Sequence, residues 1–415
     1  MADWVGGFKT DYRIANRRQS AIMATSFHNT GTAELYVSSK TMFSKSFDAK
    51  YMRIALRLAE RARGWTSPNP MVGALVVKDG RIISRGYHRR AGEPHAEAVT
   101  LEKAGNKAQG AVLYVTLEPC SHSNKRTPPC TPLVIESGVK RVVVAMIDPN
   151  PHVSGSGIKA LRKAGIEVTT GILEAEARKL NEAFVKHIAT GLPFVTLKIA
   201  QTLDGKIATA SGESKWITGE EARTEGHRLR HMNDAILVGI NTVLADDPAL
   251  TARIPGSRDP VRVVVDSSLR IPITARLLTR TVSAKTIVAA LPHAPKVKMK
   301  KLIAAGAEVI VTRSKNGRVD LRDLMRKLAK RNIMSVLIEG GAEINASACK
   351  SGIVDKVVLF IAPLLMTGRD SLCSIGGTAP ETLLQAFKIL DITTQFIGQD
   401  LMITGYIEQK SRVRR

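Results

Sequence analysis

The chain has 415 residues, of which 44% are hydrophobic and 24% charged, so it is long enough for two globular domains with separate cores. It has no apolar run of membrane-spanning length and only four cysteines, which excludes a transmembrane protein and a disulfide-stabilised scaffold. The net charge of +24 favours anionic partners, either nucleic acid or small phosphorylated substrates.

Residues 1–48 are polar and rich in Ser and Thr, without apolar periodicity, and we place them outside the fold. They lack the hydrophobic segment of a secretory signal. This N-terminal segment fits a transit peptide, although acidic residues interrupt it. It also fits an over-extended start of the chain, since two further methionines occur within the segment. The protein is therefore expected in the cytoplasm, or in a plastid if this leader is a transit peptide.

The next segment alternates between helical and extended patterns. The predicted elements are a helix over 52–62, strands over 71–77 and 82–88, a helix over 95–104, strands over 112–118 and 141–147, and helices over 158–164 and 174–190. A Lys-Asp-Gly-Arg sequence between the first two strands predicts a hairpin turn. Strands that alternate with helices indicate a layered α/β sheet.

Gly191 and Pro193 end the last of these helices, so we place a domain boundary there. The expected domains cover 49–191 and 192–410. The second contains a helix over 220–232 and strands over 194–200, 235–240, 261–266, 286–291, 307–312, 335–339 and 356–365. No internal repeat is recognisable, so two different folds are expected.

One group of residues in the first domain suggests a metal site. His95, Cys120 and Cys130 match the three protein ligands of a catalytic zinc, which leaves a fourth position for water. Glu97 then remains to take a proton from water and deliver it to a leaving nitrogen. The alternative is a pair of buried thiols and a surface histidine. The combination with a Pro before the first cysteine favours zinc.

The His-x-Glu spacing restricts the local geometry. Residues two apart on a helix point about 200° away from each other, so His95 is predicted at the non-helical start of its helix. Pro94 suits that boundary, and Glu97 would lie in the first turn. The sequence TPPC (127–130) is expected to start a second helix at Cys130.

The segments SPNPMVGALVV (67–77), PHAEA (94–98), TLEPCSH (116–122), TPPC (127–130) and DPNPHVSGSGI (148–158) resemble the deaminase half of the bifunctional riboflavin-biosynthesis deaminase–reductases. That family deaminates a phosphoribosylated diaminopyrimidinone and then reduces its ribosyl group with NADPH. The resemblance implies a cytidine-deaminase-like three-layer domain that binds zinc through His95, Cys120 and Cys130 and uses Glu97 as the proton shuttle.

The resemblance also implies substrate contacts in this half. Asn69 would hold the pyrimidine, and a basic loop residue, Lys125 or Arg126, would face the substrate phosphate. The loop is one residue longer than the usual form of the family, so both candidates stay open. Gly155-Ser-Gly157 is either a phosphate-binding loop or an ordinary turn.

The second half carries the motifs LKIAQTLDGKIATASGESKWITG (197–219), NTVLADDPALTAR (241–253), RVVVDSSLRIP (262–272) and LIEGGAEINAS (337–347), which resemble the reductase half of the same family. The resemblance thus covers about residues 50–410 and implies a domain similar in fold to dihydrofolate reductase. It assigns to the substrate Ser214, Arg230, Leu250, Arg253 and Glu339. It assigns to NADPH Ala200, Trp216, Thr242, Asp246, Ser267, Gly341, Ala342, Glu343, Ile344, Asn345, Ala346 and Ser347.

Some of these assignments have a local physical basis. Glu339-Gly-Gly341 follows an apolar strand and opens a helix, so free backbone N–H groups could meet a pyrophosphate, unless the sequence is only a tight turn. Arg230 and Arg253 could clamp a phosphate from two sides, or each could be a surface residue. Trp216 could instead pack in the core. The two remaining cysteines have no partner motif and are expected to be inert.

The interpretation that the sequence favours is an enzyme with zinc and NADPH as cofactors and a phosphorylated pyrimidine as substrate. We expect no specific nucleic-acid partner, no membrane association, and a homo-oligomer of unspecified size. One alternative, suggested by the charge, is a nucleic-acid editing deaminase, which would not explain the second half. Another is a relative in which one half is retained only for assembly.

Overall fold

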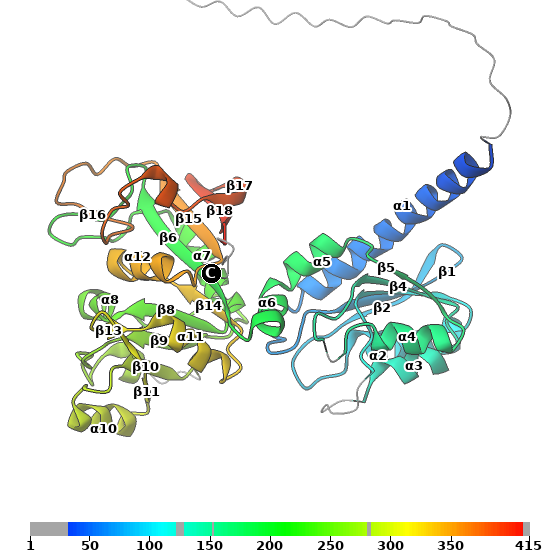
Figure 1. Ribbon diagram of the computed structural model, residues 1–415, viewed down its shortest axis with the longest axis horizontal. Helices are drawn as coiled ribbons and strands as arrows, with labels where there is room; N and C mark the ends of the chain where they lie inside the picture. The colour runs from blue at the N-terminus through cyan, green and yellow to red at the C-terminus, as the bar shows by residue number, and fades with distance from the viewer. Residues whose placement is uncertain (1–31, 122–127, 152, 280–283, 410–415) are drawn as a thin grey trace, which may run out of the picture. The chain divides into compact units, whose positions relative to one another are not determined.

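The computed structural model describes residues 32–121, 128–151, 153–279 and 284–409, with side chains from residue 46 onward (Figure 1). By its contacts the chain divides into Met1–Ser46 and Phe47–Arg415, and both large sheets belong to the second unit. The first helix, α1 (Thr32–Glu60), covers most of the helix predicted over 52–62 but starts within the segment that we placed outside the fold. Within the described ranges, no helix combines the length and the apolar character needed to cross a bilayer.

The first large sheet has five strands in the order β2-β1-β3-β4-β5. The strands are β1 (Gly73–Lys78), β2 (Arg81–Tyr87), β3 (Val112–Leu117), β4 (Arg141–Met146) and β5 (Glu167–Thr170). Strands β2, β1 and β3 pair antiparallel, and β3, β4 and β5 pair parallel. Asp79 and Gly80 both have positive φ, which confirms the predicted hairpin turn. Strand β5 was not predicted, since it is short, polar and only half-buried.

Helices cover both faces of this sheet, as a three-layer domain requires (Figure 1). One side carries α2 (Ala96–Ala104), α3 (Cys130–Glu136) and α4 (Ser156–Lys163), and the other carries the C-terminal part of α1 and α5 (Glu174–Leu180). All five helices contribute buried side chains to one apolar core with the strands. The predicted three-layer architecture is therefore confirmed.

The single helix predicted over 174–190 is wrong. The chain forms two helices, α5 and α6 (Glu182–Thr190), which are interrupted at Asn181. The Asn181 side chain accepts a hydrogen bond from the Met71 backbone N–H at 2.8 Å and donates one to the Met71 carbonyl at 3.0 Å. A buried amide that binds the backbone of a distant segment competes with helical continuity, and periodicity alone does not reveal that partner.

The second large sheet has nine strands in the order β11-β10-β9-β8-β14-β6-β15-β18-β17. They are β6 (Phe194–Thr202), β8 (Ala235–Gly239), β9 (Val261–Val265), β10 (Thr286–Ala290), β11 (Glu308–Val311), β14 (Ser335–Ile338), β15 (Lys356–Ala362), β17 (Ile389–Ile397) and β18 (Asp400–Ile407). The strands from β11 to β15 are parallel, whereas β18 and β17 add an antiparallel hairpin at one edge. That hairpin was not predicted, because the exposed β17 lacks a buried apolar face.

Helices again cover both faces of the sheet. The domain also contains α7 (Glu220–Met232), α8 (Ile240–Asp246), α9 (Arg276–Thr279), α10 (Lys296–Ala304), α11 (Leu321–Ala329) and α12 (Ala342–Ser351). Helices α11 and α12 share one apolar cluster with the strands, and α8, α9 and α10 share another. Short pairs, β7 (Lys206–Ala208) with β16 (Leu372–Cys373) and β12 (Ser314–Lys315) with β13 (Arg318–Val319), lie outside the large sheet.

The strand order creates a topological switch point between β8 and β14. From β6 the chain passes the position of β14 to reach β8, continues outward to β11, and only then returns to β14. The connections after β8 and β14 therefore run in opposite directions. In open parallel sheets, ligands bind outside the carboxyl ends of the strands at such a switch point. Helices α8 and α12 start there, directly after β8 and β14.

Candidate functional site

The three predicted metal ligands meet in the first domain. The donor atoms of His95, Cys120 and Cys130 all lie within 4.8 Å of one another, and the His95 Nδ1 atom is 3.6 Å from the Sγ of Cys120 and 3.3 Å from that of Cys130. His95 is the extended residue before α2, Cys120 follows β3, and Cys130 is the first residue of α3. One imidazole and two thiols at this spacing are a donor set that suits zinc.

Glu97 lies beside this group without belonging to it. Among the described residues, the metal-binding group contains the histidine and the two cysteines but not Glu97. Glu97 is in the first turn of α2 and is 3% exposed. Burial, together with the nearby Cys120, raises the pKa of its carboxyl to about 7. A carboxyl group with that pKa can accept and return a proton near neutral pH.

The thiols are arranged so that a cation would stabilise their ionised forms. The backbone N–H of Cys130 donates to the Sγ of Cys120 at 3.3 Å. The hydrogen bond with Cys120 and burial raise the pKa of the Cys130 thiol. Two adjacent buried thiolates are unfavourable without a positive partner, and a bound divalent metal supplies one. The residues present therefore fit a zinc ion.

A cavity of about 490 Å³ opens beside these groups. Its lining includes His95, Glu97 and Cys120 together with Asn69. The side chain of Asn69 lies 3.1 Å from the Nε2 atom of His88, which is itself buried. Sequence reasoning did not single out three further lining residues, His88, Asp148 and Asn150. For the last two, the available signal was the motif 148–158 to which they belong.

The sequence suggested two phosphate contacts in this half: a basic loop residue and the loop Gly155-Ser-Gly157. Lys125 and Arg126 lie outside the described residues. The loop Gly155-Ser-Gly157 is described, and its amides are already occupied: the N–H groups of Gly155 and Gly157 donate to the carboxylate of Glu118, each at 2.9 Å. The interpretation of this loop as a phosphate-binding site is therefore wrong, because an internal carboxylate accepts the hydrogen bonds that a phosphate would need.

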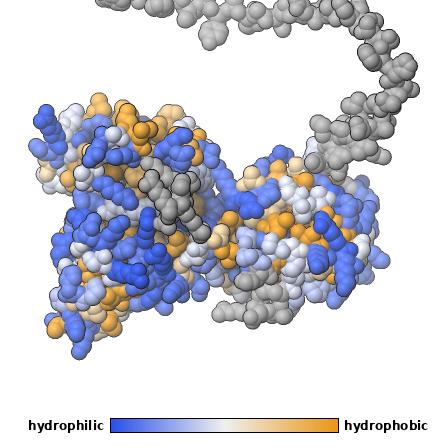
Figure 2. All heavy atoms as spheres, in the orientation of Figure 1, coloured by the Kyte–Doolittle hydropathy of each residue, from blue (hydrophilic) through white to orange (hydrophobic). Residues whose placement is uncertain are grey.

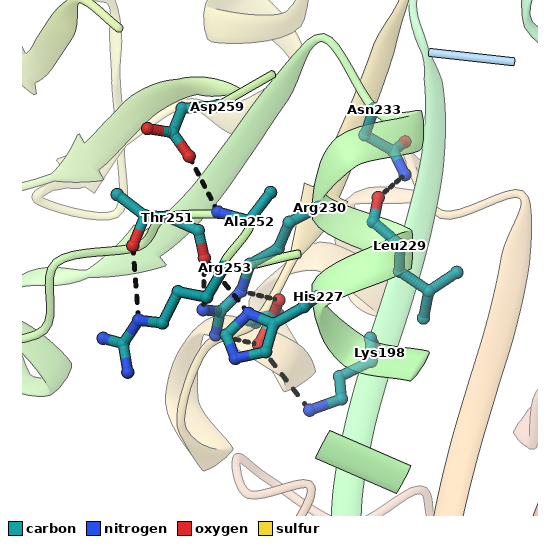
Figure 3. Close-up of polar contacts among 10 residues, drawn as sticks. Lys198, His227, Leu229, Arg230, Asn233, Thr251, Ala252, Arg253 and Asp259 are labelled. Carbon is teal, nitrogen blue, oxygen red and sulfur yellow. Dashed lines mark hydrogen bonds and ion pairs between the residues drawn. The ribbon is translucent and has the colours of Figure 1, made fainter. Parts of the chain in front are cut away.

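In the second domain, Arg230 of α7 faces Glu339 at the end of β14 (Figure 3). Two parallel hydrogen bonds join them, from Nε to Oε1 at 2.8 Å and from Nη2 to Oε2 at 2.9 Å. Lys198 of β6 lies 3.6 Å from the same carboxylate. Burial alone would raise the pKa of Glu339, but the two cations lower it to about 2. Lys198 was not predicted, although a lysine inside the apolar strand FVTLKIA was an available signal.

The expected two-arginine clamp is not what the structure contains. The guanidinium of Arg230 is engaged by Glu339 and by the carbonyl oxygen of Thr251, at 3.1 Å (Figure 3). Arg253 is exposed and donates to the side chain of Thr251 at 3.3 Å. The two arginines therefore meet at Thr251, but only Arg253 presents its charge at the surface. Leu250, also assigned to substrate, is buried beside them with a positive φ of 53°.

The residues assigned to NADPH gather at the carboxyl ends of β6, β8, β9 and β14. Ala200 is in β6, Thr242 and Asp246 are in α8, Ser267 follows β9, and 341–347 form the start of α12. A Cβ atom on Gly341 would lie 3.9 Å from the Oγ1 atom of Thr242, so the starts of α8 and α12 are adjacent. As expected, Glu339-Gly-Gly341 connects β14 to α12, so the first N–H groups of α12 lie at the carboxyl end of β14.

Not every residue in this set exposes its side chain. Ile344, Asn345 and Ala346 are buried in the core, so a ligand could reach only their backbone. Trp216, by contrast, is 67% exposed, and the guanidinium of Arg223 lies 4.8 Å from its ring centroid. The alternative that Trp216 packs in the core is therefore wrong. Ser214 is half-buried in the loop between β7 and α7.

Known families match the segments that form both large sheets. A family model described as the cytidine and deoxycytidylate deaminase zinc-binding region matches residues 45–146, and one described as the RibD C-terminal domain matches residues 193–398. The riboflavin biosynthesis protein RibD of Aquifex aeolicus (strain VF5) is 47% identical over 360 residues, which cover 86% of this chain and 98% of that protein. RibD of Escherichia coli (strain K12) is 41% identical over 374 residues, covering 86% and 98% respectively.

Solved structures agree with these matches. Acinetobacter baumannii RibD, form 1, superposes with a TM-score of 0.79 at 39% identity and covers 88% of this chain and 100% of that chain. A Thermotoga maritima protein, described as a diaminohydroxyphosphoribosylaminopyrimidine deaminase and 5-amino-6-(5-phosphoribosylamino)uracil reductase, superposes with a TM-score of 0.77 at 37% identity with the same coverage. The similarity thus extends through both candidate sites.

Proposed function

The chain belongs to the RibD family of riboflavin biosynthesis proteins, and from this premise we propose which of its residues carry out each of two reactions. The enzyme is a zinc-dependent deaminase and an NADPH-dependent reductase. It removes an amino group by hydrolysis from a phosphoribosylated diaminopyrimidinone and then reduces the ribosyl group to a ribityl chain. The observation that carries the residue assignment is the arrangement of His95, Cys120 and Cys130 beside the separate, buried Glu97.

For deamination, His95, Cys120 and Cys130 would hold the zinc. When bound, zinc supplies Lewis acidity that activates water for attack at neutral pH. Glu97 accepts a proton from the attacking water and returns it to the nitrogen that leaves as ammonia. Asn69, in the wall of the same cavity, binds the pyrimidine. Lys125, with Arg126 as the alternative, is the proposed contact to the substrate phosphate.

For reduction, we propose that the cofactor lies across the carboxyl ends of the parallel strands. The start of α12, from Gly341, binds its pyrophosphate through backbone N–H groups, and Thr242 of the adjacent α8 supports it. The other NADPH contacts are Ala200, Trp216, Asp246, Ser267 and the remaining positions to Ser347. Hydride comes from NADPH, and the protein orients the two reactants.

The reductase substrate would lie against the charged group in Figure 3. Glu339, fixed by Arg230 and Lys198, presents carboxylate oxygens that can bind ribosyl hydroxyl groups. Arg253 offers an exposed cation for the phosphate, and Ser214 and Leu250 complete the proposed contacts. Incubating the purified protein with the phosphoribosylated diaminopyrimidinone and NADPH, and following ammonia and NADPH separately, tests both reactions. Absence of ammonia release from zinc-loaded protein would reject the deaminase assignment.

Removing either proposed thiol ligand should remove the metal. Cys120→Ser and Cys130→Ser should each lower the zinc content from about one per chain to near zero and abolish ammonia release. Cys349→Ser is the matched control, since Cys349 is a buried thiol of the other domain and should have no effect on zinc. Elemental analysis measures the content. Full zinc occupancy in both ligand variants would contradict the assignment.

We propose that the domains cover 49–191 and 192–410, except that the first also includes Phe47 and Asp48, since the carboxylate of Asp48 is buried and binds Arg141. A fragment that starts at residue 192 contains every proposed reductase residue, so it should bind NADPH and reduce the deaminated substrate. It nevertheless lacks α6, whose Lys186 pairs with Asp355 and whose Glu182 accepts hydrogen bonds from Lys356 and Tyr406.

A second fragment that starts at Asn181 keeps these contacts and is the natural comparison. It should be more stable than the shorter one by about 2 kcal/mol or more, because charged hydrogen bonds to a half-buried carboxylate are each worth about 1.5–3 kcal/mol. Urea unfolding measures the difference. Equal stability would mean that α6 does not support the reductase sheet. A folded short fragment without NADPH affinity would count against the cofactor assignment.

We also propose that the protein is a homo-oligomer. Strand β17 is an edge strand whose Ile392 and Phe396 are 58% and 76% exposed, and Leu383 of η2 (Leu383–Gln385) is 94% exposed. Figure 2 shows hydrophobic residues, in orange, at the surface around η2. An uncovered apolar edge favours association with a like surface. Light scattering should give a multiple of the 45.0 kDa chain mass, and a monomer at micromolar concentration would reject the proposal.

A further inference from the structure

The carboxylate of Glu118 is buried and accepts four backbone hydrogen bonds. Its side chain follows β3, and the residue is 3% exposed. The Oε2 atom accepts from the N–H groups of Asp148 at 3.2 Å and Gly155 at 2.9 Å. The Oε1 atom accepts from Gly157 at 2.9 Å and Ile158 at 3.3 Å. Within the part of the chain that the structure describes, no Lys or Arg forms an ion pair with Glu118.

The donors come from the segment that forms one wall of the deaminase cavity. Asp148 and Asn150 line that cavity, and α4 begins at Ser156, directly after Gly155. The Glu118 carboxylate thus occupies the position that a bound anion takes at a helix N-terminus, where unpaired N–H groups and the helix dipole favour negative charge. The hydrogen bonds attach the cavity wall to the end of β3.

The same strand end also carries a proposed zinc ligand. Pro119 and Cys120 follow Glu118 directly, and the hydroxyl of Thr131 donates to both of their carbonyl oxygens, at 3.1 and 3.0 Å. Gly157 packs so closely that a Cβ atom there would lie 2.1 Å from the Pro119 carbonyl oxygen. The ligand Cys120 is therefore held between α3 on one side and the wall segment on the other.

We propose that Glu118 is a positioning residue for deamination: its carboxylate sets the distance between the zinc ligand Cys120 and the cavity wall of Asp148 and Asn150. This inference rests on the proposed deaminase function. Glu118 lines the cavity, but it is neither a proposed zinc ligand nor the proposed proton shuttle. It acts through the backbone, because its four acceptor contacts join the two segments that must face each other across the substrate.

The test is Glu118→Gln in the full-length, zinc-loaded protein. The glutamine has the same shape, but its amide NH2 must face two of the four N–H donors, so at least two hydrogen bonds are lost. Zinc release to a chromophoric chelator should accelerate and kcat for ammonia release should fall, each by about 10–100-fold, as for other residues that support metal ligands. Reduction of the deaminated substrate, measured by NADPH oxidation, should remain unchanged.

Asp48→Asn is the matched control, because Asp48 is another buried carboxylate of the same domain. It binds Arg141 and Tyr114 and does not line the cavity. Both variants should lower the thermal stability, but only Glu118→Gln should change zinc release and kcat. Wild-type zinc release and kcat in Glu118→Gln would overturn the proposal, as would equal changes in both variants. Wild-type protein that releases zinc slowly but never ammonia would instead reject the deaminase function.

If the glutamine variant does not fold, Glu118→Asp replaces it in the test. The aspartate keeps the negative charge, but its side chain is shorter by one methylene group. In Glu118→Asp, zinc release should again accelerate and kcat for ammonia release should again fall, each by a smaller factor than in Glu118→Gln. Folded Glu118→Asp with wild-type kcat and zinc release would overturn the proposal. If neither variant folds while Asp48→Asn does, Glu118 is a folding residue rather than a positioning residue, and the proposal is also rejected.

Discussion

Glu97→Gln is expected to reduce the rate of ammonia release by about 10²–10⁴-fold, the usual contribution of a general acid–base group. The amide has the same shape as the carboxylate, but at neutral pH it can neither accept the proton from water nor return it. The zinc content should stay near one per chain, because Glu97 lies outside the donor group of His95, Cys120 and Cys130. Reduction of the deaminated substrate should stay at the wild-type rate.

A second glutamate of the same helix provides the control. Glu102 of α2 is exposed, so Glu102→Gln should change neither the zinc content nor either activity. Parallel assays of ammonia release, zinc content and NADPH oxidation distinguish the outcomes. Wild-type ammonia release in Glu97→Gln would exclude it as the proton shuttle. Loss of zinc in that variant would mean that the carboxylate also supports the metal.

Arg230→Met should nearly abolish reduction and destabilise the reductase domain by about 3–5 kcal/mol. The substitution leaves the buried Glu339 with Lys198 as its remaining cation, at 3.6 Å, so most of the compensation for burying the charge is lost. Hydrogen exchange of peptides from α7 and β14 measures the local stability. Arg228→Met, on the exposed face of the same helix, should change that stability by no more than about 0.5 kcal/mol.

A double variant separates stability from function. Arg230→Met combined with Glu339→Met removes both charges, so it should recover much of the lost stability while remaining inactive as a reductase. If the double variant reduced substrate at the wild-type rate, the charged pair would be structural only. Deamination should be unaffected in both variants.

The same pair predicts a pH dependence. The pKa of Glu339 is lowered from 4.5 to about 2, so its ionised form stabilises the folded domain. This contribution is complete above pH 4.5 and is lost as the pH falls toward 2. Arg230→Met removes the main cause of the low pKa, so in that variant the acid-dependent loss of stability should be smaller and should end at a higher pH. An unchanged acid-unfolding profile would contradict the assigned partner.

The sequence by itself determined the chemistry of the zinc group and most of the elements that hold it. Metal ligands are encoded by residue type, and the stereochemistry of a helix start is enough to place His95 before the first turn, where it can face the same site as Glu97. The buried parallel strands were predictable for a related reason, since each is a short, nearly continuous run of apolar residues.

Only the tertiary structure decided which groups neutralise or bind one another across the chain. The amide of Asn181 interrupts a helix to bind Met71, and the carboxylate of Glu118 accepts the loop hydrogen bonds that the sequence offered for a phosphate. Arg230 pairs with Glu339, far away in sequence, rather than remaining available beside Arg253. In each case the deciding term is the cost of burying a polar or charged group without a partner. That partner is supplied by the fold, and no periodicity or local spacing in the sequence specifies it.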